Sequence, residues 1–358
     1  MLFATPPITE EFSLRLEALD QLRKKLRGEV ATFSPWMGTL RRQVKARSAE
    51  SSISIEGFEV SHDDAKALIK GDGVAPNDVS LMAFACYARA MDHVGVMATD
   101  PTFRWLDRVI LDLHFDACYF QRDKSPGLWR TIPVAVTTEE DAGGFAYKGP
   151  DSDDVQRLMT EVVAWLRAGD IETHPVVRAA MAHLHVVSVH PFYDGNGRIS
   201  RIIQSLVLAR ERLVSPEFGS IEEYLAANTP TYYAALKKVQ GGSYQPDRDA
   251  SAWVGFCIDA HLAQAKQRLA QIEEAAARWS VLEGLAEGHG WPDRLVVALE
   301  QSLVGGLDRM TYSSETDVSV ATASADFRRL LDAGLVEQRG RGRSTRYTAS
   351  TRLHTLLG

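Results

Sequence analysis

The sequence has 358 residues, of which 45% are hydrophobic, and its formal net charge is −7 at pH 7. A chain of this length and composition can bury a sizeable core and holds two or three domains. The acidic balance argues against a protein that coats nucleic acid as a whole, and we expect neither a membrane span nor a secretory signal at its start.

The three cysteines, Cys86, Cys118 and Cys257, are widely spaced and set in apolar surroundings. This pattern favours reduced, buried thiols over a disulfide framework or a zinc site. We therefore expect a cytoplasmic protein. No internal repeat is visible.

The predicted elements are mostly helices. Apolar periodicity and turn residues predict helices, in chain order, at residues 10–28, 63–69, 77–97, 101–119, 152–167, 175–189, 199–213 and 251–287. Glycines and a proline at residues 288–292 break the last helix, which we interpret as a connector to a different C-terminal module.

The segment from His190 to Arg201 carries the most chemistry. Pro191 ends the preceding helix near His190, because the residue before a proline is pushed out of the α region. Residues 194–197 then form a tight loop before the next helix. The N-terminus of a helix attracts phosphate.

Two residues of this segment suit proton transfer and metal binding. His190, with an ordinary pKa of about 6.5, can accept a proton near neutral pH, as a general base must. Asp194 is a hard oxygen ligand of the kind that Mg²⁺ takes while it bridges phosphates. Taken alone, a histidine before proline is more typical of a helix end, and an Asp-Gly-Asn-Gly run is more typical of an ordinary turn.

The other positions suit phosphate. Gly195 and Gly197 can adopt positive φ, so that with Asn196 their backbone N–H groups converge on an oxyanion. Arg198 and Arg201 lie on the first turn of the next helix, where they can grip β- and γ-phosphates bidentately. Together these features predict polyphosphate chemistry.

The segment resembles the signature of Fic-domain proteins, His-x-Phe-x-Asp/Glu-Gly-Asn-Gly-Arg-x-x-Arg, and meets all of its defining positions. The resemblance implies transfer of AMP from ATP to a Tyr, Ser or Thr hydroxyl of a target protein, with release of pyrophosphate. It also implies that His190 is the base, that Asp194 holds Mg²⁺, and that residues 195–197 cradle the phosphates. Arg198 and Arg201 would take the outer phosphates.

A second resemblance precedes the segment. Residues 126–130, Pro-Gly-Leu-Trp-Arg, resemble the family's Pro-Gly-x-x-Arg element, and residues 134–136 resemble its β-hairpin flap. Such a flap would hold the target peptide as an added strand. We assign Val136 and Thr137 to the nucleotide site on this basis, although residues 133–147 equally suit a polar surface loop.

A third resemblance follows the segment. Tyr232, Tyr233 and Gln240 resemble the family's adenine-side helix, where a tyrosine pair and a later amide line the base pocket. Gln240 stands where family members commonly have Asn, and its longer amide can still bind a base. Tyrosines that face a helical core remain an equal alternative.

The residues Ser52, Glu56 and Gly57 resemble the family's inhibitory motif, Ser/Thr-x-x-x-Glu-Gly/Asn. The resemblance implies that Glu56 pairs with Arg201 and occupies the space of the γ-phosphate, so that ATP binds without in-line alignment. Because Ser52 and Glu56 are four residues apart, we expect them to share a helix face.

The tail resembles a winged-helix domain, with residues 340–347 as the wing. From Arg328 to Gly358 the chain has seven arginines and two acids, a local net charge of +5. This charge suits contact with DNA phosphates, but a winged helix used for dimerisation or target docking suits the sequence equally.

The sequence thus predicts a mainly α protein with a Fic-type helical core, a β-hairpin flap and a C-terminal winged helix-turn-helix domain. Its expected divisions are an N-terminal helical region with the inhibitory motif at 1–100, the core at 101–245, a connector at 246–289 and the winged helix at 290–358. ATP and Mg²⁺ are the expected substrate and cofactor, and a protein is the expected target. Self-modification, a homodimer, removal of AMP, and a DNA-binding regulator that senses nucleotide stay open.

Overall fold

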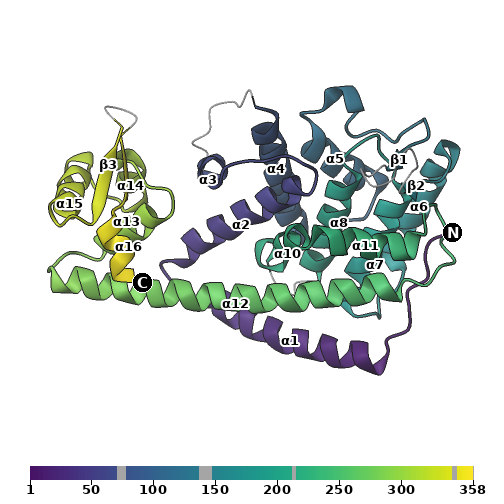
Figure 1. Ribbon diagram of the computed structural model, residues 1–358, viewed down its shortest axis with the longest axis horizontal. Helices are drawn as coiled ribbons and strands as arrows, with labels where there is room; N and C mark the ends of the chain where they lie inside the picture. The colour runs from purple at the N-terminus through teal and green to yellow at the C-terminus, as the bar shows by residue number, and fades with distance from the viewer. Residues whose placement is uncertain (71–77, 137–146, 212–214, 341–344, 358) are drawn as a thin grey trace. The chain divides into compact units, whose positions relative to one another are not determined.

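The computed structural model describes residues 1–70, 78–136, 147–211, 215–340 and 345–357 (Figure 1). The chain divides into two compact units. Unit 1 comprises Met1–Gly28 and Val44–Arg268, and unit 2 comprises Glu29–Gln43 and Leu269–Gly358. The helices α1 (Glu10–Ala31), α2 (Met37–Ser54) and α12 (Ser251–Gly288) have residues in both units. The four-part division expected from the sequence stays a prediction.

Unit 1 is built from helices. Besides parts of α1, α2 and α12, it contains α3 (His62–Lys70), α4 (Val79–Thr99), α5 (Asp107–Cys118), the 3₁₀ helix η1 (Arg122–Lys124), α6 (Ser152–Ala168), α7 (Pro175–Val189), α8 (Asn196–Arg210), α9 (Pro216–Gly219), α10 (Glu222–Ala227) and α11 (Thr229–Gln240). The mainly α fold class is therefore confirmed. Among the described residues, no helix has the length and apolar character that a membrane span needs.

Helices α7 and α8 form the centre of unit 1. In α7 every residue after Pro175 is buried, and in α8 only Gly197 and Arg210 are not. These two helices pack against each other, and α4 and α5 pack against α8 (Figure 1). The loop between α7 and α8 is therefore held from several sides by the core.

Two predicted helix starts differ from the structure. The helix expected at 101–119 begins only at Asp107, because Asp100 accepts hydrogen bonds from the backbone N and the hydroxyl of Thr102, both at 2.7 Å, and stabilises a turn instead. The helix expected at 199–213 begins at Asn196 and ends at Arg210. Asn196 and Gly197 therefore belong to a helical first turn and not to the loop.

A two-stranded hairpin lies before α6. Strands β1 (Ala135–Val136) and β2 (Tyr147–Lys148) pair antiparallel, with Ala135 opposite Lys148 and Val136 opposite Tyr147. This pairing agrees with the predicted flap. The residues between the strands, Thr137 among them, lie outside the described part of the chain.

Unit 2 ends in a small helical module with a second hairpin. Its elements after α12 are α13 (Arg294–Leu303), α14 (Arg309–Glu315), α15 (Val320–Asp332), β3 (Val336–Arg339), β4 (Arg346–Ala349) and α16 (Thr351–Leu357). Strands β3 and β4 are antiparallel, and Tyr312, Phe327 and Tyr347 pack in the core. Residues 341–344 of the expected wing lie outside the described residues, and the winged-helix assignment stays a prediction.

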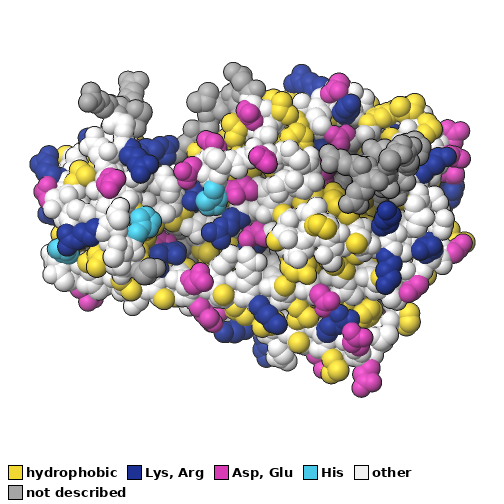
Figure 2. Space-filling model, in the orientation of Figure 1, with side chains coloured by type: hydrophobic (Ala, Val, Ile, Leu, Met, Phe, Trp, Pro, Cys, Tyr) yellow, Lys and Arg dark blue, Asp and Glu magenta, His cyan; other side chains and the backbone are white. Residues whose placement is uncertain are grey.

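Basic and acidic side chains are interspersed over the visible face of the protein (Figure 2). On that face neither sign of charge gathers into one continuous field. This distribution agrees with a net charge of only −7 on 358 residues.

Candidate active site

His190 ends α7 in a left-handed conformation, with φ 52° and ψ 57°. Its ring Nδ1 lies 3.2 Å from the carbonyl oxygen of Val187. Because a carbonyl can only accept, Nδ1 carries the hydrogen and Nε2 keeps a free lone pair. Burial lowers the pKa of His190 to about 4. The ring is therefore neutral at pH 7, with Nε2 able to accept a proton.

Asp194 is held by its neighbours in the loop. Its Oδ1 accepts a hydrogen bond from the backbone N of Gly195 at 2.7 Å, and its Oδ2 accepts from the amide of Gln121 and from Arg198 at 3.3 Å. Its backbone oxygen accepts from Nε2 of His114 at 3.0 Å. The carboxylate is thus fixed beside Arg198 and remains about a third exposed, at 37%.

The loop is closed by Asn196, whose side chain bonds both backbone groups of Phe192 at 2.9 Å. Phe192 is fully buried and stacks on His114 at 3.5 Å between ring centroids. Gly195 has φ 77°, and a Cβ there would meet the sulfur of Cys118 at 2.4 Å. The backbone of the loop therefore requires glycine at this position.

Arg198 places its guanidinium beside two aromatic rings that contact each other. Its Cζ lies 5.7 Å from the centroid of Phe58 and 5.3 Å from that of Phe120. Its NH2 donates to Gln121 at 3.0 Å as well as to Asp194. The buried Nε and NH1 have no hydrogen-bond partner among the described residues. Buried donors of this kind are costly unless an anion binds to them.

Arg201 is bound by the segment that contains the predicted inhibitory motif. Its Nε donates to the Ser52 hydroxyl at 2.8 Å, and its NH2 donates to the Ser52 carbonyl and to Glu56 Oε1, both at 2.9 Å. Burial is the largest single influence and lowers the pKa of Arg201, but Glu56 together with Tyr232 and Tyr87 outweighs it, so the pKa is raised. In the described chain the buried NH1 has no partner. Arg201 thus pairs with the Glu56 carboxylate through NH2, while its NH1 donors remain available to a ligand.

Glu56 itself lies beyond the helix. Helix α2 ends at Ser54, and Glu56 and Gly57 form the following turn, in which Gly57 has φ 83°. The expectation that Ser52 and Glu56 share a helix face is therefore wrong for Glu56, which lies outside the helix. Both reach Arg201, but Glu56 does so from the turn. Its Oε1 would lie only 2.5 Å from a Cβ on Gly197, so the carboxylate rests against the first turn of α8.

The three residues assigned to the adenine pocket lie in different environments. Tyr232 is 1% exposed and its hydroxyl lies 3.1 Å from Nε2 of His183. Gln240 is also buried and donates to the Ser188 hydroxyl at 3.0 Å. Tyr233 is 45% exposed and its hydroxyl is 3.5 Å from the carbonyl of Ile55. Only Tyr233 offers an accessible ring next to the turn of Glu56.

The hairpin is tied to the catalytic loop by Arg130. Its three nitrogens donate to the carbonyls of His190 at 2.8 Å, Ile132 at 3.0 Å and Pro150 at 2.6 Å. Tyr193 adds a link, because its hydroxyl accepts from the backbone N of Thr131 at 2.9 Å. Val136 thus sits on a strand whose base is fixed to His190. Thr137 is not among the described residues.

Sequence reasoning missed several residues that shape this site. His114, Gln121, Phe58 and Phe120 all contact the loop or its arginines. Gln121 and Asp194 are 73 positions apart. No local spacing predicts such contacts, because only the packing of α5 on α8 brings them together.

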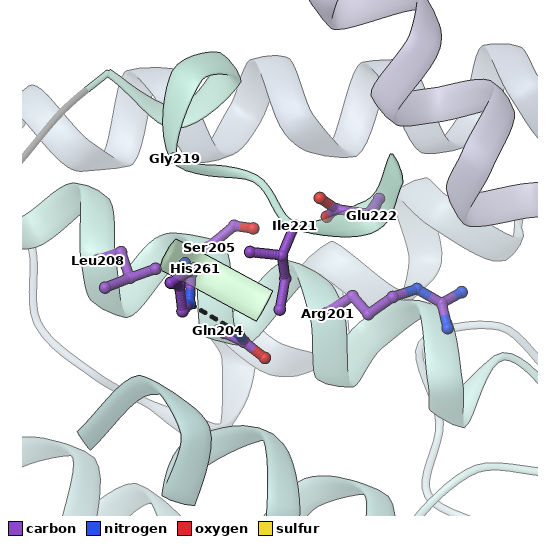
Figure 3. Close-up of a pocket in the computed structure, with 8 residues that line it drawn as sticks. All are labelled: Arg201, Gln204, Ser205, Leu208, Gly219, Ile221, Glu222 and His261. Atoms are coloured by element: carbon purple, nitrogen blue, oxygen red, sulfur yellow. Dashed lines mark hydrogen bonds between the residues drawn. The ribbon is translucent and has the colours of Figure 1, made fainter. Parts of the chain in front are cut away.

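A narrow cavity lies beside α8, next to Arg201 (Figure 3). It is lined by Arg201, Gln204, Ser205, Leu208, Gly219, Ile221, Glu222 and His261, and its empty space is about 180 Å³. The space is too finely divided to hold a water molecule. It is therefore a packing gap behind Arg201 and not a nucleotide pocket.

Residues 105–208 match the Fic/DOC family, a range that contains α5 to α7 and nearly all of α8. The protein adenylyltransferase Fic of Drosophila melanogaster is 30% identical over 315 residues, which are 77% of this chain and 58% of that protein. The protein adenylyltransferase fic-1 of Caenorhabditis elegans is 26% identical over 205 residues, 54% of this chain and 36% of that protein. The chain thus spans less than two thirds of the length of these relatives.

Solved structures share the fold. A Fic family protein from Desulfovibrio desulfuricans G20 aligns over 97% of this chain and 98% of its own, with a TM-score of 0.60 at 19% identity. Fic-1 from C. elegans aligns over 72% of this chain and 71% of its own, with a TM-score of 0.57 at 21% identity. At these identities the likeness concerns the fold alone.

Proposed function

The chain carries a Fic/DOC-family domain at residues 105–208, and from this premise we propose that the protein transfers AMP from ATP to a Tyr, Ser or Thr hydroxyl of a target protein. Curated relatives named protein adenylyltransferases support this reaction class. The observation that carries the proposal is the protonation geometry of His190, whose free Nε2 stands at the edge of a loop with unpartnered arginine donors.

In the proposed reaction, the target hydroxyl oxygen attacks the α-phosphorus of ATP. The bond from that phosphorus to the oxygen shared with the β-phosphate breaks, and pyrophosphate leaves. The hydroxyl proton passes to Nε2 of His190. The backbone N–H groups of residues 195–197 and the free donors of Arg198 and Arg201 bind the phosphates and stabilise the charge on the leaving pyrophosphate.

The residues of the loop fit a Mg²⁺ ion held mainly by the nucleotide. The described residues contain no group of three or more His, Cys, Asp or Glu side chains that could hold a metal. Mg²⁺, however, commonly binds through one carboxylate together with substrate phosphates and water. Asp194, partly exposed at the mouth of the loop, is the side chain that would hold it. The ion would supply positive charge to the phosphates.

We further propose that Glu56 inhibits the enzyme. Its carboxylate uses the NH2 of Arg201, which a phosphate would otherwise bind, and lies against Gly197. An anion from within the chain and an anion from ATP cannot occupy this place together. Displacement of Glu56 would therefore be needed before the α-phosphate can align with an attacking hydroxyl.

Incubation of the purified protein with labelled ATP and Mg²⁺ tests both proposals. We expect weak self-labelling of the wild type, strong self-labelling of Glu56→Gly, and none of the Glu56→Gly/His190→Ala double variant. Equal labelling with and without His190 would rule out the base assignment. Release of AMP from a labelled target by the wild type, without labelling by Glu56→Gly, would favour AMP removal instead.

A second candidate function, DNA binding by the C-terminal module, is favoured by the surface of α15. This helix exposes Ala321 and Ala325 on its first turns and Arg328 and Arg329 further on. Short side chains let a helix approach base edges closely, and arginines bind phosphates.

Fluorescence anisotropy of a labelled duplex with the full chain tests this candidate. Binding should weaken steeply between about 50 and 200 mM salt and with Arg328→Ala. The exposed Arg104→Ala in unit 1 serves as the matched control. If Arg328→Ala and Arg104→Ala give the same anisotropy curve, α15 does not bind DNA, and docking of a protein becomes the favoured role of the module.

A further inference from the structure

We propose that the segment carrying Glu56 is also a part of the nucleotide site, because Ser52 and Phe58 orient the two arginines that bind the phosphates. The inference rests on the proposed function for the role of those arginines. It separates Glu56, which blocks the site, from the residues on either side of it, which help to build it.

Ser52 binds the Nε and NH2 edge of the Arg201 guanidinium, and NH1 lies outside this edge. Its hydroxyl accepts from Nε at 2.8 Å and its carbonyl from NH2 at 2.9 Å. This pair of bonds fixes the plane of the guanidinium and leaves NH1 and the second hydrogen of NH2 to an anion. In this structure Glu56 accepts the hydrogen bond from NH2. The orientation that Ser52 gives to the guanidinium would therefore suit either the Glu56 carboxylate or a phosphate.

Phe58 acts on the other arginine. Its ring lies over Arg198 and contacts Phe120 edge-on at 5.4 Å between centroids. The guanidinium lies over both rings, and its Nε and NH1 remain without partners among the described residues. A cation held over aromatic faces keeps its in-plane donors available. Phe58 therefore orients Arg198 without competing for the donors that a phosphate needs.

The segment is anchored independently of Glu56. Ser52 and Ile53 are fully buried, and the Ser48 hydroxyl accepts a hydrogen bond from Ser220 at 3.1 Å. On the same side of the core the Tyr87 hydroxyl donates to the buried Glu222 at 2.9 Å.

The Glu56 side chain is 19% exposed and lies in a turn. Release of inhibition can therefore occur by movement of the Glu56 side chain while Ser52 and Phe58 stay in place. A segment that only inhibited would have to leave the arginines altogether.

Calorimetric titration of MgATP tests the proposal without turnover. The parent is the Glu56→Gly/His190→Ala variant, which lacks both the blocking carboxylate and the base. We expect Phe58→Leu and Ser52→Ala in this parent to weaken MgATP affinity by about three- to tenfold. Phe58→Tyr and Ser52→Thr, which keep the ring and the hydroxyl, should restore it. Ser54→Ala removes an exposed hydroxyl at the end of α2, just before the turn, and is the matched control.

Affinity unchanged by both Phe58→Leu and Ser52→Ala would overturn the proposal, as would a parent that binds no MgATP. An equal loss in Ser54→Ala would assign the effect to general disturbance of the turn and would also overturn it. If Ser52→Ala fails to fold, as thermal unfolding would reveal, the pair Phe58→Leu and Phe58→Tyr decides. The two proposals can fail separately. If the parent binds MgATP but the Glu56→Gly variant transfers no AMP, the proposed function is rejected, and the titrations still test whether Ser52 and Phe58 belong to the nucleotide site.

Discussion

Glu56 and Arg201 form a buried ion pair in which Oε1 lies 2.9 Å from NH2, and the side chains are 19% and 1% exposed. The guanidinium thus depends on an anion supplied from the turn after α2. An ion pair that is also a binding site must be broken before a ligand can use it. Stability and ligand binding are therefore coupled at this position.

Glu56→Gln should make this coupling measurable. The change keeps the size of the side chain and removes its charge, so the buried Arg201 loses its direct anion, and we expect a loss of about 1–3 kcal/mol in the free energy of unfolding by urea. MgATP should raise the melting temperature of the variant more than that of the wild type. A smaller ligand-induced shift in the variant would contradict competition at Arg201.

Acid should destabilise unit 1 through its buried histidines. Burial lowers the pKa to about 4 for His114 and His190, and to about 3 for His183 and His185. The unfolded chain binds these protons below pH 6.5 and the folded chain only near pH 3–4, so stability is present above pH 6.5 and is lost as the pH falls toward 4.

Urea unfolding at several pH values measures this loss, which amounts to about 1.4 kcal/mol per pH unit for each histidine within the window. Self-labelling of Glu56→Gly, by contrast, should stay level down to about pH 5, because His190 remains neutral there. A labelling rate that falls with a midpoint near pH 6.5 would show an unperturbed base.

His185 offers a stabilising change. It is 1% exposed, packs edge-on against Trp165, and in the described chain neither ring nitrogen has a hydrogen-bond partner. His185→Leu should raise the free energy of unfolding by about 1–2 kcal/mol at pH 7, because it removes buried unsatisfied groups. The gain should grow at pH 5, where the unfolded wild type binds a proton. The exposed His289→Leu is the control, and an equal gain there would contradict the explanation.

Gly195 in the loop and Gly197 in the first turn of α8 should differ in their tolerance of alanine. At Gly195 the φ of 77° is unfavourable for alanine and the new Cβ meets the buried Cys118, so we expect a loss of about 2–4 kcal/mol. At Gly197 the Cβ meets the end of the flexible Glu56 side chain, and the cost should be nearer 1 kcal/mol. Thermal unfolding compares the two, and a cost at Gly197 as high as that at Gly195 would show that the Glu56 side chain does not move aside for the new Cβ.

The local part of the site could be predicted from the sequence. His190, Asp194 and the arginines lie within one helix, loop and helix turn, and the positions of Pro191 and Gly195 indicate where the chain bends. The expectation of a positive φ at Gly197 is wrong, because Gly197 lies in the first turn of α8. Local chemistry and local geometry coincide there. The match to Ser52 and Glu56 likewise predicted a contact that the structure contains, although the glutamate reaches it from a turn.

Contacts between distant segments could not be predicted. Periodicity shows that Tyr232 lies on a helix but not whether its ring faces a pocket or His183. Phe58 and Gln121 carry no motif of their own, and their contacts arise only when α5 and the turn after α2 pack beside α8. The late start of the helix at Asp107 reflects a side-chain turn at Asp100, which competes with helix over a few residues only.

The turn that presents Glu56 makes the blocking group an intramolecular competitor. A tethered carboxylate acts at an effective concentration fixed by the length and geometry of its tether, so dilution of the protein does not weaken it. A freely diffusing anion displaces the carboxylate from Arg201 only when its concentration, multiplied by its affinity for the site, exceeds the same product for the tethered carboxylate. The occupancy of the site would then follow the nucleotide level in the surroundings and not the amount of protein.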